Sequence, residues 1–156
     1  MATVRLEPMS DSEYLAWRAR AIGYYADDHV AAGNWSREDA LELSRAEFES
    51  YLPQGTSTPD NWLWTVRADG GAEVGILWVA RSKRQPSMAF IYDITMSDSR
   101  QGQGFGTATL RWLDDWARRE GFTSIGLHVF GKNEGARRLY QRMGYAETEV
   151  QMAKQL

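Results

Sequence analysis

The chain has 156 residues, of which 43% are hydrophobic and 25% are charged, as in ordinary globular proteins and unlike disordered or collagen-like chains. This length predicts one domain spanning residues 1–156. No apolar run reaches the roughly 20 residues that span a bilayer. Residues 1–10 lack the apolar stretch of a signal peptide, so we expect a cytoplasmic protein without membrane contact. The absence of cysteine and the presence of only two histidines exclude thiolate and histidine-rich metal sites, so no metal is expected.

The net charge of −3 argues against non-specific binding to nucleic acid. Acidic side chains outnumber basic ones in residues 1–60, and basic side chains outnumber acidic ones in residues 61–156. This distribution would suit a cationic substrate beside an anionic cofactor. Two solvated surfaces of unlike charge would give the same distribution.

The first third of the chain is predicted to be mainly helical. A short strand is expected at residues 4–6, before a proline. Two helices follow, at about residues 11–26 and 37–51, because apolar residues recur there at helical spacing and a serine precedes each. The polar residues 54–60 are expected to form a loop.

The remainder of the chain alternates between strands and helices. Helices are expected at residues 104–120 and from Asn133 to about residue 143. An Asp-Gly-Gly turn predicts a hairpin between the first two strands of this part. The pattern indicates an α/β (α+β) fold, with a mixed, mostly antiparallel sheet of about six or seven strands flanked by about four helices. Besides residues 4–6, strands are predicted at residues 62–67, 73–80, 88–96, 124–130, 145–148 and 150–154.

A glycine-rich loop lies between the predicted strand at 88–96 and the helix at 104–120. Glycines let the backbone approach a ligand closely, and the first turn of a helix presents unpaired N–H groups, so this arrangement can hold a pyrophosphate. The loop lacks the Gly-Lys-Ser/Thr ending of a P-loop, and its glycine spacing differs from that of a dinucleotide-binding fold. A strand–helix turn without a ligand is the alternative. The candidate residues are Gln101, Gly102, Gln103, Gly104, Phe105, Gly106 and Thr107.

A second motif follows the strand predicted at 124–130, and the two motifs form a specific pair. The first contains a glutamine and two glycines before a helix. The second contains an asparagine and then an Ala-x-x-Leu-Tyr-x-x-x-Gly-Tyr run. The residues of the pair are Gln101, Gly104, Gly106, Asn133, Ala136, Leu139, Tyr140, Gly144 and Tyr145.

This pair resembles the motifs of the GNAT acyltransferases, which use acyl-coenzyme A. Tyr145 stands where the family has phenylalanine, a mild departure, and the resemblance covers the whole chain. The chain looks closest to small single-domain bacterial members, with which it shares the stretch from Asn34-Trp35 to Pro53 and the run Phe90-Ile91-Tyr92-Asp93. The resemblance implies acetyl-coenzyme A as cofactor, coenzyme A as product, and no metal.

The resemblance also implies how the cofactor would lie. Backbone N–H groups of residues 103–107 would hold the pyrophosphate. The pantetheine arm would run along the strand from Ile94 to Met96 like an added strand, with a backbone N–H near Met96 facing the thioester oxygen. Asn133 would contact this arm or order the loop before the last helix. Arg137 belongs to the same motif and is a further cofactor-binding candidate.

Three residues are candidates for catalysis. Tyr140 matches the tyrosine that protonates the leaving thiolate in the family, and a pKa of about 10 keeps such a hydroxyl protonated; core packing is the alternative. His128 occupies the point where the ribosomal-protein alanine acetyltransferases have a glutamate base, and a histidine suits that role. Asp93 is the rival base, since a carboxylate in an apolar strand is partnered or functional.

Tyr25, Asp28 and Trp35 are weaker candidates for the acceptor site, because a carboxylate beside aromatic rings suits a cationic amine. A capped helix end over an aromatic core is the alternative. The expected reaction is direct transfer of an acetyl group to a primary amine of a small molecule. Acetylation of a protein N-terminus or lysine, and a non-catalytic acyl-coenzyme A sensor, are the alternatives. The protein is expected to be a monomer or a homodimer.

Overall fold

The computed structural model describes all residues from Met1 to Leu156. No helix in it combines the length and the apolar composition needed to cross a membrane. The elements, in chain order, are β1 (Val4–Pro8), α1 (Asp11–Ala31), α2 (Arg37–Tyr51), η1 (Gly55–Ser57), β2 (Asn61–Ala68), β3 (Glu73–Arg81), β4 (Met88–Met96), η2 (Asp98–Arg100), α3 (Phe105–Arg119), β5 (Ser124–Leu127) and α4 (Glu134–Arg142).

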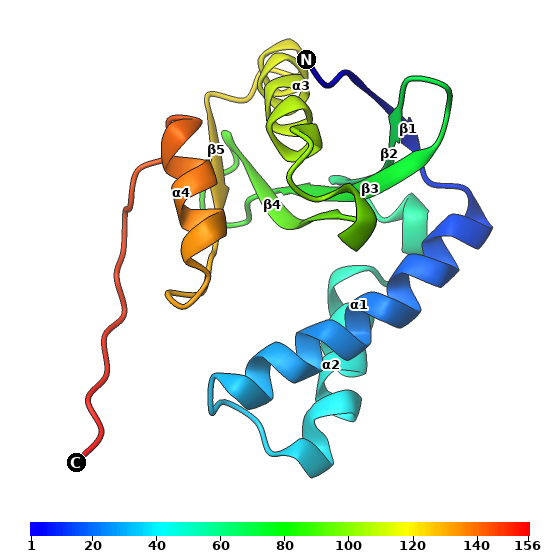
Figure 1. Cartoon of the computed structure of the whole chain (residues 1–156). Helices are drawn as coiled ribbons and strands as arrows, with labels where there is room; N and C mark the ends of the chain where they lie inside the picture. Colours follow the sequence, from blue (N-terminus) through cyan, green and yellow to red (C-terminus); the bar gives the residue numbers. More distant parts are fainter.

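The sheet has five strands in the order β1-β2-β3-β4-β5. The pairs β1–β2, β2–β3 and β3–β4 are antiparallel, and β5 runs parallel to β4. The mixed, mostly antiparallel α/β (α+β) fold is therefore confirmed, with helices on both sides (Figure 1). The turn between β2 and β3 also agrees with the sequence, since Gly70 and Gly71 both have the positive φ that such a turn needs.

The predicted number of strands was wrong. Residues 145–148 and 150–154 form no strand, and the chain from Ala146 onward is exposed throughout. The last helix holds the start of this segment, because the backbone N–H of Tyr145 donates to the Tyr140 carbonyl over 3.0 Å. Arg137 then pairs with Glu147 over 2.6 Å. The chain consequently leaves α4 away from the sheet (Figure 1).

The ends of two elements also differ from the predicted ones. The strand expected at residues 124–130 ends at Leu127. The first helix continues to Ala31 rather than to about residue 26, because no glycine or proline lies between Ala26 and Gly33. Gly33 has a φ of 78°, a conformation that favours glycine and marks the end of this helix.

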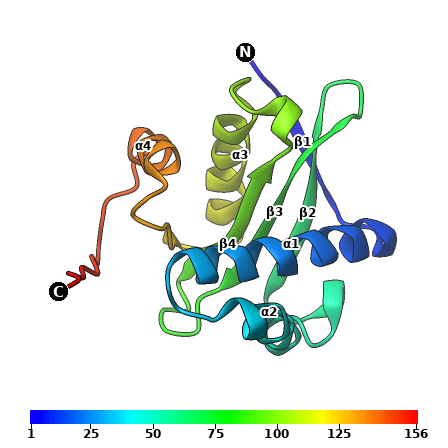
Figure 2. The same cartoon turned by 60° about the horizontal axis from the view of Figure 1, so that its bottom comes forward.

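The sheet separates two hydrophobic cores. Figure 2 shows α1 and α2 in front of the sheet and α3 behind it. On the α3 side, Leu110 and Leu113 are fully buried, and burying such a side chain stabilises the fold by about 1.5–3 kcal/mol. On the other side, the core joins the two helices to the strands through Met9, Tyr14, Trp17, Ala21, Ile22, Phe48, Leu52, Leu63, Ile76 and Trp78.

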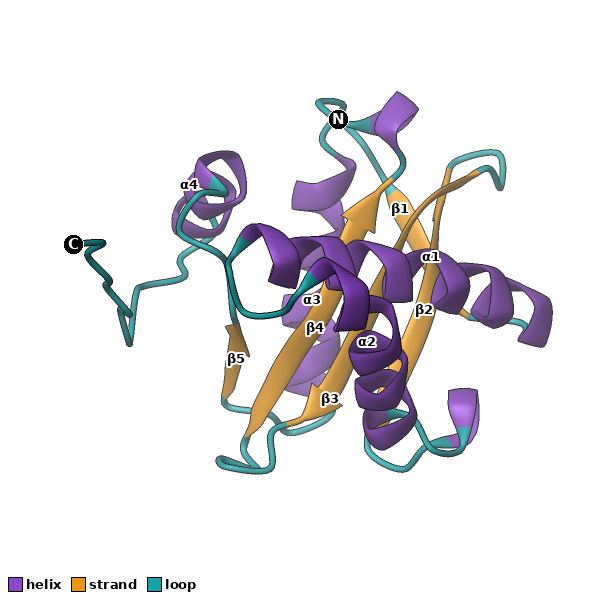
Figure 3. Cartoon of the chain, turned by 90° about the horizontal axis from the view of Figure 1, so that it is seen from below, coloured by secondary structure: helices purple, strands orange, loops and turns teal.

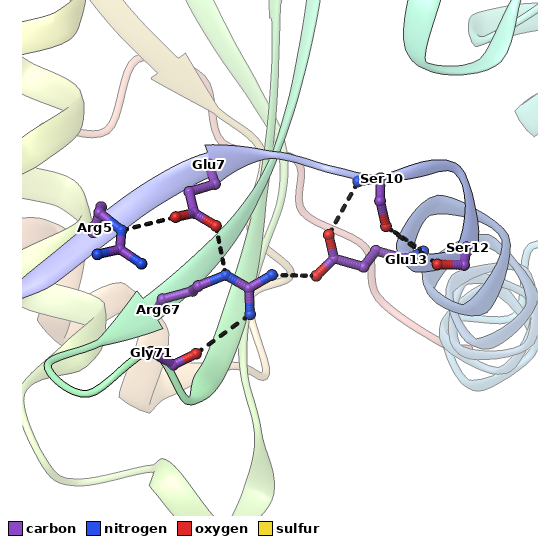
Figure 4. Close-up of polar contacts among 7 residues, drawn as sticks. All are labelled: Arg5, Glu7, Ser10, Ser12, Glu13, Arg67 and Gly71. Carbon is purple, nitrogen blue, oxygen red and sulfur yellow. Dashed lines mark hydrogen bonds and ion pairs between the residues drawn. The ribbon is translucent and has the colours of Figure 1, made fainter.

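One arginine connects the beginning of the chain to the β2–β3 hairpin (Figure 4). The Arg67 guanidinium pairs with Glu7 on β1 and with Glu13 in α1, each over 2.7 Å. Glu13 also accepts from the backbone N–H of Ser10, which completes a reciprocal cap at the start of α1. β1, β2 and α1 are thus held together by one ionic network.

Candidate active site

β4 and β5 diverge halfway along β4. The two strands pair only from Met88 with Ser124 to Ile91 with Leu127, whereas β4 continues its pairing with β3 as far as Met96. The β4 edge at residues 92–96 therefore has no strand beside it on the β5 side. Such an edge presents free backbone N–H and C=O groups that an extended ligand can use.

A β-bulge at Tyr92 sets the direction of the side chains along this open edge. Trp78 pairs with Asp93 and the next residue, Val79, pairs with Ile91, so Tyr92 is the extra residue on β4. Because side chains alternate between the two faces, one inserted residue reverses the alternation beyond it. Ile91 packs in the core beneath α3. The bulge places Asp93 on the opposite face, toward α1.

Asp93 is held by two hydrogen bonds on that face. The indole N–H of Trp17 donates to Oδ2 over 3.0 Å, and the Thr95 hydroxyl donates to Oδ1 over 2.6 Å. Burial raises the pKa of Asp93, the two hydrogen bonds oppose this effect, and the nearby charge of Asp28 adds to it. The carboxyl is therefore fixed in position and binds a proton more readily than a carboxyl in water.

Tyr140 lies on α4. It is half-buried and lies against the main core, as does Tyr145, whose ring centroid is 5.7 Å away. Burial raises the pKa of Tyr140, and the charge of Asp93 raises it further. The charge of Asp93 thus acts on Tyr140, although the two residues are far apart in the sequence.

His128 lies just beyond the end of β5 and is exposed. Its ring meets the edge of Phe130, with 5.3 Å between the ring centroids.

Two residues at the last helix have hydrogen-bond partners within the chain. The Asn133 side chain caps α4 by accepting from the Ala136 N–H over 3.2 Å, and Arg137 contacts the Gly131 carbonyl as well as Glu147.

The glycine-rich loop stands between the end of β4 and the start of α3. Gly102 and Gly104 have φ values of 75° and 84°, which glycine adopts without strain. A Cβ added at Gly102 would project into open space, so the backbone here is accessible. The Gln101 amide donates to the Met96 carbonyl over 3.4 Å, which links the loop to the open edge of β4.

The first turn of α3 differs from those of the other α-helices. A side chain caps each of α1, α2 and α4, whereas Gly104 precedes α3 and offers no side-chain cap. The N–H groups of the first turn are therefore left available to an anion. Phe105 packs inward against the core, and a Cβ on Gly106 would meet Leu139 of α4 at 3.6 Å, so loop, α3 and α4 adjoin.

Ile94 and Met96 lie at the end of β4 that this loop follows. Both are half-buried and pack against the core beneath α3. Gly75 on β3 lets Met96 and the Thr95 carbonyl approach, since a Cβ on Gly75 would collide with both. The close approach of residues 95–96 to β3 consequently requires glycine at position 75.

The candidate acceptor residues gather where α1 ends. The Trp35 ring stacks on His29 at 4.0 Å, and Tyr25 meets the edges of both rings. Partial burial and the neighbouring charge of Asp27 raise the pKa of Asp28. Tyr25 and Trp35 therefore pack within an aromatic cluster. The charge of Asp28 raises the pKa of Asp93.

Sequence reasoning missed an acidic residue beside this cluster. One carboxylate oxygen of Glu47, on α2, is buried and has no hydrogen-bond partner. Burial and the neighbouring Glu47 carboxylate both raise the pKa of Tyr25, and Tyr51 and Tyr92 contribute further. Glu47 adjoins the buried Phe48 in α2, and a carboxylate beside a helix's buried stripe is the signal that would have identified it.

Comparison with known proteins agrees with this geometry. The model of the acetyltransferase (GNAT) family matches residues 29–145. The N-acetyltransferase YycN of Bacillus subtilis is 37% identical over 155 residues, which are 99% of each chain. YdgE of the same organism is 35% identical over 152 residues, 97% of each chain.

Solved structures also resemble this chain along nearly its whole length. The crystal structure of YycN superimposes with a TM-score of 0.93 over 99% of each chain. AAC(6′)-Iy, in complex with the bisubstrate analogue CoA-S-monomethyl-acetylneamine, is 15% identical with a TM-score of 0.62, over 98% of this chain and 97% of its own. That second likeness shows a shared fold. Given the family match over more than half of the sequence and relatives alike along the whole length, the chain belongs to the acetyltransferase (GNAT) family and is an N-acyltransferase.

Proposed function

We propose that the protein is an acetyl-coenzyme A-dependent N-acetyltransferase that acetylates a primary amine of a small molecule directly, without a covalent enzyme intermediate. The observation that carries this proposal is the open edge of β4, where Trp17 and Thr95 fix the Asp93 carboxyl and the charge of Asp93 raises the pKa of Tyr140 on α4. That edge lies between the glycine-rich loop and the acidic, aromatic end of α1 and α2. An acid and a base would thus stand between a cofactor site and an amine site.

The residues of the loop fit coenzyme A. Glycines with positive φ, accessible backbone at Gly102 and an uncapped helix at Gly104 together suit a pyrophosphate. We assign residues 101–107 to this group and the open edge at Ile94 and Met96 to the pantetheine arm. The fold of AAC(6′)-Iy, which holds a coenzyme A analogue, supports the assignment. When bound, acetyl-coenzyme A supplies the acetyl thioester.

We assign Asp93 as the general base, because two hydrogen bonds orient it and its charge acts on Tyr140. It would take a proton from the ammonium group, directly or through water. Tyr140 would donate its proton to the departing thiolate. A backbone N–H near Met96 would donate a hydrogen bond to the carbonyl oxygen and so stabilise the negative charge that develops there. Asn133 and Arg137, which hold α4 and its neighbouring loop, would keep Tyr140 in place.

The amine would bind between Asp28 and Glu47. Glu47 has a buried oxygen without a partner, and an ammonium group would satisfy it. The aromatic rings of Tyr25 and Trp35 would flank the carbon skeleton of the amine and attract its charge. This acidic surrounding favours a cationic acceptor over a carboxylate or an alcohol.

The test is a panel of small primary amines and short peptides assayed with acetyl-coenzyme A, following the release of free thiol. We expect turnover of small cationic amines. Glu47→Gln should raise the KM for the amine by about tenfold or more, as removal of a hydrogen bond to a charged group implies, with little change in the KM for the cofactor. Glu42→Gln is the matched control, since Glu42 is exposed on the same helix. Turnover of peptides alone would contradict the proposed acceptor.

A further inference from the structure

A pocket lies at the end of the sheet opposite the glycine-rich loop. The end of α2, the start of β2 and the turn between β3 and β4 form it, and its volume is about 260 Å³. Figure 3 shows α2 running toward the end of the sheet at which β3 turns into β4, while β4 continues to η2 and α3 from the other end. None of the residues that we assign to the cofactor lines this pocket, so it is available to another part of the reaction.

Two tyrosines connect the pocket to the proposed amine site. Tyr51 and Tyr92 both line it, with 5.3 Å between their ring centroids. Tyr51 stands four residues after Glu47 on α2, so the two side chains lie one turn apart on the same face of the helix. Tyr92 directly precedes Asp93 on β4 and stacks on Trp78, on the side of the sheet that α1 and α2 cover. The pocket and the amine site are thus neighbours along both elements.

The opposite wall of the pocket is basic. It belongs to the turn between β3 and β4, residues 81–86, which we call the basic turn. Arg81 and Lys83 line the pocket, and Asp60 is its one carboxylate. Arg81 pairs with Asp60 over 3.2 Å and donates to the Pro86 carbonyl over 2.9 Å. Lys83 is exposed and takes part in none of the ion pairs of the structure, so its charge is available to a ligand.

The spacing of the two charged ends suits a small extended molecule. Asp93 pairs with Trp78 on β3, and β3 ends three residues later at Arg81. At the rise of a strand, the basic turn therefore begins about 10 Å from Asp93 along the sheet. The rings of Tyr51 and Tyr92 are 38% and 39% exposed and offer an apolar surface between the two ends. An apolar chain lying on these rings would join a group at Asp93 to a group at the basic turn.

We propose that the acceptor is a zwitterion, whose ammonium group binds beside Asp93 and Glu47 and whose anionic group binds Lys83 in this pocket. The inference rests on the proposed function and narrows its substrate class. The buried Glu47 oxygen without a partner attracts the ammonium end and repels the anionic one, and Lys83 does the reverse. The two ends thus allow one orientation, in which the amine faces the cofactor site. A diamine is disfavoured, because its second ammonium group would meet the basic turn.

The first test compares three amines that share one carbon chain: 8-aminooctanoate, octylamine and 1,8-diaminooctane, whose far ends are anionic, neutral and cationic. We expect kcat/KM to fall in this order, by roughly two- to fivefold at each step, as for an exposed ion pair. The differences should shrink in about 1 M salt, where charges are screened. Equal kcat/KM values for the three would overturn the inference and leave the proposed function standing.

Titration calorimetry with the same amines tests the pocket without turnover. We expect 8-aminooctanoate to bind most tightly and 1,8-diaminooctane most weakly. This order in a protein that acetylates none of the three would contradict the proposed function and support the pocket. Equal affinities would overturn the zwitterion, whether or not the amines are acetylated.

The second test changes the charge of the pocket. Lys83→Gln should abolish the preference for 8-aminooctanoate over octylamine, and Lys83→Glu should reverse the order so that 1,8-diaminooctane is preferred. Arg84→Gln is the matched control, because it removes a positive charge from the same turn at an exposed residue that does not line the pocket. It should keep the preference. Equal effects of Lys83→Gln and Arg84→Gln, or an unchanged order in Lys83→Glu, would refute binding at Lys83.

Discussion

The carboxylate of Asp93 on β4 acts on the hydroxyl of Tyr140 on α4. Burial raises the pKa of Tyr140, and the charge of Asp93 raises it further, so the hydroxyl holds its proton at neutral pH. Burial also raises the pKa of Asp93, which brings this carboxyl closer to the pH at which a general base works best. Tyr140 is therefore suited to donate a proton and Asp93 to accept one, and the charge of Asp93 helps to set the pKa of Tyr140.

Asp93→Asn should lower kcat/KM by roughly 10²–10⁴-fold, because it removes the proposed base while keeping its shape. The acidic limb of the pH profile of kcat/KM should disappear with it. Since burial raises the pKa of Asp93, its charge opposes folding once the pH exceeds that pKa. The melting temperature of the variant should consequently equal or exceed that of the wild type at pH 8.

His128→Gln is the comparison for this experiment, because His128 is the other candidate base. We expect it to retain most of the activity and an unchanged pH profile. If instead the acidic limb is lost in His128→Gln and kept in Asp93→Asn, the role of base belongs to His128.

Tyr140→Phe should slow turnover by roughly 10²–10⁴-fold when proton donation limits the rate. The variant lacks only the hydroxyl and keeps the ring that packs near Tyr145, so coenzyme A should bind with unchanged affinity. Single-turnover kinetics separate the chemical step from product release. A wild-type rate in that measurement would show that Tyr140 serves only packing.

Gly104→Val should abolish stabilisation by coenzyme A. At a ligand concentration about 100 times the Kd, the cofactor should stabilise the wild type by roughly 2.7 kcal/mol, measured by thermal unfolding. Gly104 has a φ of 84°, so the substitution also adds backbone strain. Gly70→Val controls for this, because Gly70 has a φ of 92° in the distant hairpin and should keep the full effect of the ligand. Equal ligand effects in both variants would place the cofactor elsewhere.

Gly75→Ala should destabilise the protein by about 1–3 kcal/mol, measured by denaturant unfolding. The added Cβ would collide with the Thr95 carbonyl and with Met96, and rigid backbone cannot move aside cheaply. Gly23→Ala is the opposite case. Gly23 lies within α1 with no atom near its missing Cβ, so alanine there should stabilise the helix by up to about 1 kcal/mol. A neutral effect of Gly75→Ala would show that β3 and β4 can shift apart.

Arg67→Met should lower the melting temperature at neutral pH and matter less in acid. The hydrogen bond from Arg67 lowers the pKa of Glu7 from its ordinary 4.5. The backbone hydrogen bond from Ser10, with Arg67 contributing, lowers that of Glu13. Lowered carboxyl pKa values contribute stability above pH 4.5, and this contribution is lost as the pH falls through the folded-state values. A difference in melting temperature that stays constant between pH 7 and pH 3 would contradict this account.

Local chemistry determined much of this protein from its sequence. The serine and asparagine caps, the Asp-Gly-Gly hairpin and the glycines before α3 each act within a few neighbouring residues. A cap or a positive φ needs no distant partner, so these features could be predicted. The paired motifs around Gly104 and Tyr140 likewise indicate the family from the sequence alone.

The tertiary structure decided what depends on distant partners. The bulge at Tyr92 arises from pairing with β3, and this pairing turns Asp93 toward Trp17 rather than into the core beneath α3. Glu47 became a candidate only when the packing of α2 buried its oxygen near Tyr25. The C-terminal segment is the clearest case. Alternation at residues 150–154 predicts a strand, but no strand forms there in the structure, because a strand needs a neighbouring edge with which to pair.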